Sequence, residues 1–369
     1  MSEEDQAPPI PDHIRDLAAY QPGRLIEDVI EEMGLATAVK LASNENSLGP
    51  SPLAVERIGR ALWGLARYGD ADSRRLREAI SRKVGHPAAG VMAGNGSSEF
   101  ILVMAHALLG PGLTAVMSRP SFTLYAKNAQ AAGARAIEVP LGPGHGHDLE
   151  GILRQAGPEA RLVFIDNPLN PTGAFLGQGE IERLLRGLPR TAILVLDEAY
   201  ADFARAPRPD YGRLLADGRV VILRTFSKVM GLAGLRAAYA LAAPPLAQAL
   251  NKVRQPFNLN NLAQVGAMAA LEDEGHVRRT LEMTWSALDR LGRELPALGL
   301  EVFPTQANFV MAGLPDGLLA DDFAKKMLTE GVIVRSLSSF GLPGHVRINA
   351  GLEPELEALL GAMAKVLAA

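Results

Sequence analysis

The pattern of apolar and polar positions divides the chain into a long alternating region and a less regular C-terminal third. Between about residue 113 and residue 226, apolar runs of strand length are separated by turn residues and by segments of helical periodicity. Such alternation is typical of βαβ units, which form a mostly parallel sheet with helices on both faces. We therefore predict an α/β fold. The runs interpreted as strands are LTAVMS, ARAIEVP, ARLVFID, TAILVLD and VVILRTF.

Helical patterns lie on both sides of this region. Ser51 followed by Pro52 is a common start of a helix. Before the alternating region we expect helices over residues 24–33, 51–64 and 73–84, and one that starts in the serines after Gly94-Asn95-Gly96. After it, a long helical region over residues 262–295 precedes shorter strand and helix patterns.

These patterns predict two domains. A large domain would cover residues 44–261, and a small C-terminal domain with a long connecting helix would cover residues 262–369. Residues 1–43 would form an N-terminal arm that contributes to the small domain.

Composition and charge exclude several classes of protein. The chain has 369 residues and a formal net charge of −4, so its charge does not indicate binding to nucleic acid or to an anionic membrane. It contains no cysteine, which excludes disulfides, thiolate nucleophiles and cysteine-bound metal. The acidic start MSEEDQAPPIPDHIR is unlike a signal peptide, and no apolar run approaches the roughly 18 residues of a membrane span. We expect a soluble, cytoplasmic protein.

Polar side chains follow three of the predicted strands. Residues 166–170 (DNPLN) come after ARLVFI, residues 197–200 (DEAY) after TAILVL, and residues 225–228 (TFSK) after VVILR. In an open parallel sheet, ligands bind at the carboxyl ends of the strands. We therefore expect these side chains to line one edge of the sheet, with Arg236 close by.

Lys228 is a candidate for Schiff-base chemistry at this edge, because a desolvated lysine near other cations can become neutral and attack a carbonyl. The groups around it are those that pyridoxal phosphate requires. A buried carboxylate such as Asp197 keeps the pyridine nitrogen of this cofactor protonated. Asn170 and Tyr200 can donate hydrogen bonds to its phenolic oxygen.

The phosphate of this cofactor requires an arginine, hydroxyl groups and free backbone N–H groups at the start of a helix. Arg236 can provide the guanidinium, and Phe122 in RPSFTLY can stack on the ring. The hydroxyl groups would come from Ser97, Ser98, Thr225 and Ser227.

Together the motifs resemble those of the fold-type I aminotransferases, which depend on pyridoxal phosphate, and within them the histidinol-phosphate aminotransferase branch. The matching segments run from about Tyr20 to Gly351 in the family's order. The resemblance implies a large, mostly parallel, seven-stranded sheet domain and a smaller α/β domain. The motifs are LASNENSLGPSP, RYGD, GNGSSE, NPLNPTG, LDEAY, RTFSKVMGLAGLR, VRQPFNLN, ANFV, GVIVRS and HVRINAG.

The resemblance also implies roles for single residues. Lys228 would form the internal aldimine and shuttle the proton, while Asp197 would hold the pyridinium. Arg347 would bind a substrate carboxylate, and Tyr68 would reach the phosphate bound by the neighbouring subunit of a homodimer. Further substrate-binding residues would be Arg335, Tyr20 and Asn44.

The implied reaction is transamination of L-histidinol phosphate with 2-oxoglutarate, a step of histidine biosynthesis, and no metal is implied. Enzymes that resemble this chain also act on aromatic amino acids, and a related group decarboxylates threonine phosphate. Phe122 and Phe340 depart from the branch, because they stand where tyrosine is common.

Three other interpretations of the sequence fit its motifs less well. AGNGSSE suggests a nicotinamide-dependent oxidoreductase, but it lacks the third glycine of the dinucleotide fingerprint. GHGHD, with His145, His147 and Asp148, suggests a metal, but no third imidazole is nearby in the sequence, so we interpret it as a solvated loop. A pyridoxal-binding regulatory protein would need a DNA-binding module, for which we expect no room before Asn44.

Overall fold

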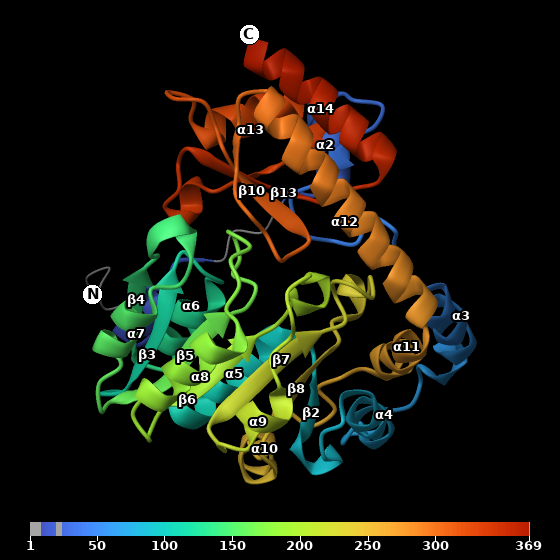
Figure 1. The fold of residues 1–369 in the computed structure, drawn as a ribbon. Helices are drawn as coiled ribbons and strands as arrows, with labels where there is room; N and C mark the ends of the chain where they lie inside the picture. The colour runs from blue at the N-terminus through green and yellow to red at the C-terminus, as the bar shows by residue number, and fades with distance from the viewer. Residues whose placement is uncertain (1–8, 20–23, 369) are drawn as a thin grey trace, which may run out of the picture.

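A computed structural model describes residues 9–19 and 24–368 of the chain (Figure 1). A larger body holds a seven-stranded sheet, and a smaller body lies against the edge of the larger one. The long helix α12 (Glu274–Ala297) runs from one body to the other. No helix among the described residues is long and apolar enough to cross a membrane.

The large sheet is mostly parallel, as predicted. Its order is β2-β8-β7-β6-β5-β3-β4, and β8 is antiparallel to both of its neighbours. The five predicted runs correspond to five of the strands, while β2 and β8 were not among them. These two are short and rich in alanine and glycine, which gives them a weak strand signal. The strands are β2 (Val91–Gly94), β3 (Thr114–Arg119), β4 (Arg135–Pro140), β5 (Ala160–Asp166), β6 (Ile193–Asp197), β7 (Val220–Thr225) and β8 (Ala238–Ala242).

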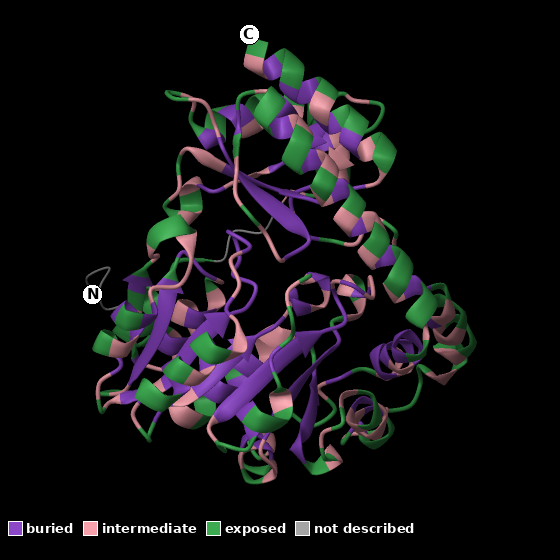
Figure 2. Cartoon of the chain, in the orientation of Figure 1, coloured by how far each residue is buried: buried purple, intermediate pink, exposed green. Residues whose placement is uncertain are grey.

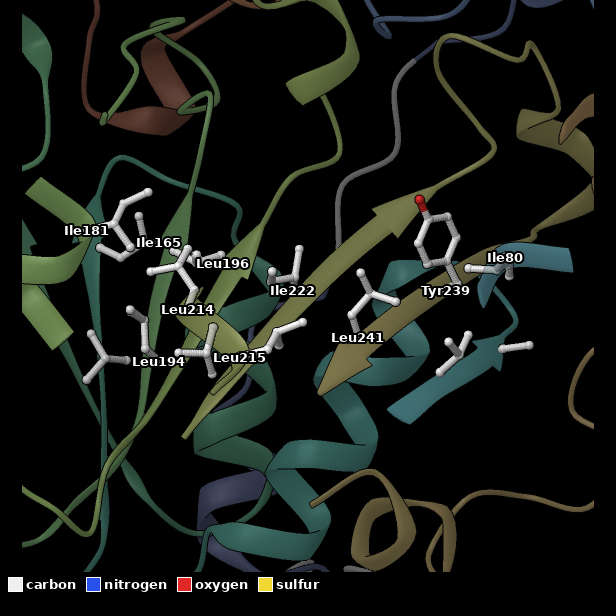
Figure 3. Packing of buried hydrophobic residues seen from close by; sticks show 14 of the residues in the cluster. Ile80, Ile165, Ile181, Leu194, Leu196, Leu214, Leu215, Ile222, Tyr239 and Leu241 are labelled. Atoms are coloured by element: carbon white, nitrogen blue, oxygen red, sulfur yellow. The ribbon is translucent and has the colours of Figure 1, made fainter. Parts of the chain in front are cut away.

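Helices cover both faces of this sheet, because side chains alternate between its faces along every strand. Leu194 and Leu196 of β6 pack into one cluster with residues of α7, α8 and α9 (Figure 3). Val195 between them packs into a second cluster with residues of α5, α6 and α10. The helices are α5 (Ser97–Leu108), α6 (Leu124–Ala131), α7 (Leu149–Gln155), α8 (Gln178–Gly187), α9 (Tyr211–Leu215) and α10 (Pro244–Asn251).

The small body has its own core around a four-stranded antiparallel sheet of order β12-β13-β10-β9. Strand β1 (Val39–Lys40) pairs in parallel with β11 (Val332–Ile333), which attaches the N-terminal segment to this body. The domain boundaries at residues 43 and 261 stay a prediction. The remaining strands are β9 (Glu301–Val302), β10 (Phe309–Gly313), β12 (Arg335–Ser336) and β13 (His345–Asn349). The helices are α2 (Ile26–Met33), α13 (Ala320–Thr329) and α14 (Glu353–Ala368).

The long helical region predicted over residues 262–295 is two helices. Asp273 separates α11 (Asn261–Glu272) from α12, and its side chain accepts a hydrogen bond from the backbone N–H of His276. Asp273 also accepts a hydrogen bond of 2.7 Å from Ser51, the residue that caps α3 (Pro52–Ala61). One aspartate thus starts α12 and fixes it to α3. The other helical segments are α1 (Asp12–Arg15), α4 (Arg74–Val84), η2 (Leu62–Gly64), η3 (Ala88–Gly90), η4 (Pro143–His145), η5 (Ala201–Phe203), η6 (Ala233–Leu235) and η7 (Ser338–Phe340).

The burial pattern matches this layering. The strands of the large sheet other than the edge strand β4 are buried almost throughout, while the outer faces of the surrounding helices are exposed (Figure 2). The chain leaves β7 into the loop 226–236, where Gly231 has φ +68°. A Cβ atom on Gly231 would lie 2.1 Å from the backbone oxygen of Gly49 and 2.9 Å from Cα of Pro50. Only glycine allows this close approach of two backbone segments.

We therefore expect Gly231→Ala to lower the free energy of unfolding by at least about 2 kcal/mol, because left-handed strain and a backbone clash add together. Gly234→Ala, three residues further on, is the matched control: Gly234 has no left-handed φ and open space around its Cα. Urea unfolding of both variants would measure the difference. Equal stability of the two variants would contradict the packing described for Gly231.

Candidate active site

A cavity of about 210 Å³ lies at the carboxyl ends of β5, β6 and β7. Most of the residues predicted to bind the cofactor line it. The exceptions among the predicted site residues are Tyr68, Asn44, Arg335 and Arg347, while Tyr20 lies outside the described residues. The predicted residues that line it are Ser97, Ser98, Phe122, Asn170, Asp197, Tyr200, Thr225, Ser227, Lys228 and Arg236.

Lys228 enters the cavity from the loop that follows β7. Its Nζ donates a hydrogen bond of 3.5 Å to the backbone oxygen of Ser43, from the N-terminal segment. The same atom lies 5.4 Å from the centre of the Tyr200 ring. The amine is therefore held at the seam between the large body and the N-terminal segment, facing the cavity.

Asp197, the last residue of β6, is 5% exposed, and both of its carboxylate oxygens accept a hydrogen bond. Its Oδ2 accepts a hydrogen bond of 2.9 Å from the Tyr125 hydroxyl, and its Oδ1 accepts one of 3.1 Å from the N–H of Ala199. Burial raises the pKa of Asp197 to about 6, and these hydrogen bonds and the charge of Lys228 oppose that rise. A buried carboxylate of this kind favours a cationic partner in the cavity.

Tyr125 was missed by the sequence analysis. It is fully buried on α6 and stacks on Phe164, with ring centroids 4.5 Å apart. It lies three residues after Phe122, which precedes α6, and both residues line the same cavity. The three-residue spacing of Phe122 and Tyr125 in RPSFTLY was the sequence signal that could have indicated Tyr125 as a site residue.

The other end of the cavity suits an anion. Helix α5 begins at Ser97, so the backbone N–H groups of its first turn point toward this end. Thr225 donates a hydrogen bond of 2.9 Å to the Ser227 hydroxyl, and Arg236 lies 3.5 Å from the same oxygen. A Cβ atom on Gly96 would lie 2.4 Å from Nη2 of Arg236, so a glycine is required for the guanidinium to approach. Hydroxyls, a guanidinium and a helix start together form a binding site for a dianion.

Arg347 and Asn44 lie behind the cavity and connect it to the small body. Arg347 donates a hydrogen bond to Oδ1 of Asn170 and one of 2.7 Å to the backbone oxygen of Ala42. Asn44 donates a hydrogen bond of 3.0 Å to the Tyr200 hydroxyl. Asn170 and Tyr200, the two residues predicted to bind the ring oxygen, are each held by a residue predicted to bind substrate.

Arg335 lies near this group but does not line the cavity. It pairs directly with Arg347 across the antiparallel strands β12 and β13, so the two side chains lie on the same face of the small sheet. Its guanidinium carbon lies 5.7 Å from the centre of the Phe340 ring. Like charges placed opposite each other repel, which favours an anion on this face.

Tyr68 does not line its own cavity. It is 86% exposed, and its ring centroid lies 4.8 Å from that of Phe257. Trp63, in the same segment, is 96% exposed, and Leu62 and Leu65 are also exposed. A surface with so many large apolar side chains is typical of a contact with another protein chain.

The interpretation of GHGHD as a solvated loop was wrong for His147. His147 is partly buried, with Nδ1 2.6 Å from the Ser118 hydroxyl and Nε2 2.9 Å from the backbone oxygen of Asp166. Its Nε2 must therefore carry the proton, and its Nδ1 accepts from Ser118. His145 instead packs edge-on against His345 of the small body, 5.4 Å away. Across residues 9–19 and 24–368, no cluster of three or more metal-ligating residues occurs.

The fold and the cavity define a class: an α/β enzyme scaffold with a lysine, a buried carboxylate and an anion site at its strand ends. The sequence model of the aminotransferase class I and II family matches residues 36–363. The chain belongs to this family.

Individual proteins are similar to this chain over nearly its whole length. The chain is 42% identical to the histidinol-phosphate aminotransferase of Akkermansia muciniphila over 96% of this chain and 98% of that protein. It is 41% identical to histidinol-phosphate aminotransferase 2 of Ralstonia nicotianae over 97% of both chains. The crystal structure of histidinol-phosphate aminotransferase from Sinorhizobium meliloti in complex with pyridoxal-5'-phosphate has a TM-score of 0.89 and 28% identity, and 98% of each chain is covered.

The partly buried imidazole of His147 makes the stability of the protein depend on pH. Burial lowers the pKa of His147 from 6.5 to about 4, although the hydrogen bond to Asp166 opposes this. Between these two values the unfolded chain binds a proton that the folded chain does not, so the free energy of unfolding falls as the pH falls. The loss begins near pH 6.5, is complete below about pH 4, and amounts to about 3 kcal/mol.

We expect His147→Gln to remove this pH dependence, because glutamine does not titrate. Urea unfolding from about pH 8 to about pH 4 would show the stability difference between wild type and variant shrinking by about 3 kcal/mol. His106→Gln, exposed on α5, is the matched control and should leave the wild-type slope unchanged. A difference between wild type and His147→Gln that is constant with pH would contradict a buried neutral imidazole.

Proposed function

We propose that this chain is a pyridoxal-phosphate-dependent aminotransferase that transfers the amino group of L-histidinol phosphate to 2-oxoglutarate, forming imidazole-acetol phosphate and glutamate. One observation supports the reaction most strongly: a single cavity gathers an amine, a buried carboxylate and a dianion site at the ends of three neighbouring strands. The names of the relatives support this substrate and a role in histidine biosynthesis. Such a role would place the enzyme in the cytoplasm.

The residues of the cavity fit the three functional groups of pyridoxal phosphate. The helix start at Ser97, the hydroxyls and Arg236 would hold the phosphate. Asp197 would hold the protonated pyridine nitrogen, and Phe122 would contact the ring face. When bound, the cofactor supplies an aldehyde for an amine and a ring that accepts an electron pair.

The protein's own residues have separate tasks in this reaction. Lys228 would bind the cofactor through Nζ and, once released, would move a proton at the amino-bearing carbon of the substrate. Asn170 and Tyr200 would orient the ring, and their positions are fixed by Arg347 and Asn44. Burial of these groups excludes water from the site and strengthens every charged interaction within it.

The two substrates carry their anions differently. Histidinol phosphate has no carboxylate but ends in a phosphate, whereas 2-oxoglutarate carries two carboxylates. Arg347 and Arg335, opposite each other on β13 and β12, would provide cations for both, with Tyr20 of the N-terminal segment as a hydroxyl donor. Two cations on different strands suit both anions better than a single arginine.

We further infer that the functional unit is a homodimer with shared active sites. Tyr68 does not line its own cavity, and it stands among exposed Trp63, Leu62 and Leu65. A second copy that covers this surface by two-fold symmetry would bring the Tyr68 hydroxyl of one chain to the anion site of the other.

This arrangement predicts complementation between two defective chains. Lys228→Ala should bind the cofactor only loosely and lose transamination, because the amine is both the anchor and the proton carrier. Tyr68→Ala should lose a contact to the phosphate. Refolding the two variants together should form one site with both Lys228 and Tyr68 intact, so the activity of the mixture should exceed that of either parent.

Turnover by Lys228→Ala within about tenfold of the wild type would contradict its assignment. A mixture no more active than its better parent would contradict shared sites. Mixing Lys228→Ala with the wild type is the control for loss of activity by subunit exchange alone.

The distal anion of the substrate predicts an asymmetry. Removing one charged hydrogen-bond partner costs about 1.5–3 kcal/mol, or roughly ten- to a hundredfold in kcat/KM. Arg335→Ala should lose this much on histidinol phosphate but much less on phenylalanine, which has no distal anion. Arg186→Ala, on the exposed face of α8, is the control and should affect neither donor.

Steady-state kinetics with both donors against 2-oxoglutarate would measure these losses. Equal losses on the two donors, or no turnover of histidinol phosphate by the wild type, would instead favour an aromatic amino acid aminotransferase.

A further inference from the structure

Asp166 is a second buried carboxyl group in the cofactor cavity, and the proposed reaction does not use it. It ends β5, lines the cavity and is 3% exposed. It is paired in register with Asp197 at the end of β6, so the two carboxyl groups come from adjacent strand ends. Burying two carboxylates so close together is costly unless each is compensated.

The partners of the two carboxyl groups differ. Asp197 accepts hydrogen bonds from Tyr125 and Ala199 and lies near the charge of Lys228. Among the described residues, the side chain of Asp166 accepts one, of 3.0 Å, from the N–H of Asn170 through Oδ2. Its Oδ1 is buried and has no hydrogen-bond partner among residues 9–19 and 24–368.

Two titratable groups near Asp166 direct their hydrogen bonds to atoms other than its carboxyl group. His147 is neutral and donates to the backbone oxygen of Asp166 rather than to its carboxyl group. Arg347 donates a hydrogen bond to Oδ1 of Asn170, and Tyr125 donates one to Asp197. A charge that acts on Asp166 is the negative charge of Asp197, which raises the pKa of Asp166.

Two interacting carboxyl groups with unequal partners share their protons unequally. The hydrogen bonds and Lys228 favour the charge on Asp197. Burial raises the pKa of Asp166 well above its ordinary range, and the charge of Asp197 adds to this rise, while the Asn170 N–H opposes it. A proton shared by the pair therefore belongs on Asp166 rather than on Asp197.

We propose that Asp166 is a positioning residue of the cofactor site, a role that rests on the proposed function. It keeps its proton at neutral pH and donates a hydrogen bond from its unpartnered oxygen to the bound cofactor. A neutral acid in this place adds a donor without adding a charge. Asp197 then remains the counter-ion of the ring, and Asp166 holds both the cofactor and the N–H of Asn170. Apolar surroundings that keep a carboxylic acid neutral for this purpose are known in other enzymes.

The first test needs no activity. Infrared spectra of the wild type and of Asp166→Asn, both without cofactor at neutral pH, should differ by the C=O stretching band of one protonated carboxylic acid. A difference spectrum that shows a carboxylate band at this pH would overturn the proposal. Because asparagine has the same shape and can still accept from Asn170, a fold change is not expected, and circular dichroism would check this.

The second test compares neutral and charged substitutions in the cofactor-loaded protein. If Asp166 is a neutral donor, the amide of Asp166→Asn should replace it: the cofactor Kd should stay within about threefold, and the pH midpoint of the visible absorbance within about 0.3 units. Asp166→Ala, which removes the donor, should raise the Kd about two- to tenfold. The matched control is Asp197→Asn, the same change on the paired residue, which should weaken binding more than tenfold because it removes the counter-ion.

A shift of the midpoint by about one unit or more in Asp166→Asn would show that a negative charge had been removed, and would overturn the proposal. A cofactor Kd of Asp166→Ala equal to that of the wild type would contradict the proposed hydrogen bond from Asp166 to the cofactor. Transamination of histidinol phosphate by the wild type is assayed separately, so failure of the proposed function would be recognised independently of these outcomes.

Discussion

The site depends on one constraint: β5, β6 and β7 are parallel and in register, so their last residues meet at one edge. Asp166 pairs with Asp197, and Asp197 pairs with Leu223 of β7. Parallel pairing thus gathers side chains that are about 30 residues apart in the sequence, and the loop after β7 adds Lys228. Loss of this register by one residue would turn every one of these side chains to the opposite face.

The alternation of side chains also builds a second group of charges behind the site. Glu198 follows Asp197 but points to the other face, where it contacts Tyr211 of α9 and lies 3.3 Å from Arg224. Arg224 also pairs with Asp202 at 2.5 Å. Burial raises the pKa of Glu198, and although burial acts in the same direction on Asp202, its arginine partners hold the pKa of Asp202 below the ordinary value. This network joins the ends of β6 and β7 on the side away from the cofactor, so the strand ends that carry the site are held from both faces.

Much of this arrangement was predictable, because periodicity and strand ends are local signals. The runs that became β3 to β7 and the polar residues after them were read directly from the sequence, and the structure brings most of those residues to one cavity. Their roles with cofactor and substrate remain proposals. Tyr125 and His147 were missed because their importance comes from partners on other elements, Asp197 and Asp166. The break at Asp273 was missed although Asp273 is the N-cap of α12, a local signal, to which the contact with distant Ser51 adds.

The same long-range contacts tie the cofactor cavity to the smaller body. Ser43 accepts from Lys228, Asn44 donates to Tyr200, and Arg347 donates to Asn170. All three contacts join residues of the N-terminal segment or the small sheet to residues of the large sheet edge. An anion that draws Arg347 toward itself must therefore act on Asn170 as well, because one guanidinium serves both. Under the proposed function, binding of substrate and the orientation of the cofactor ring would be coupled through this side chain.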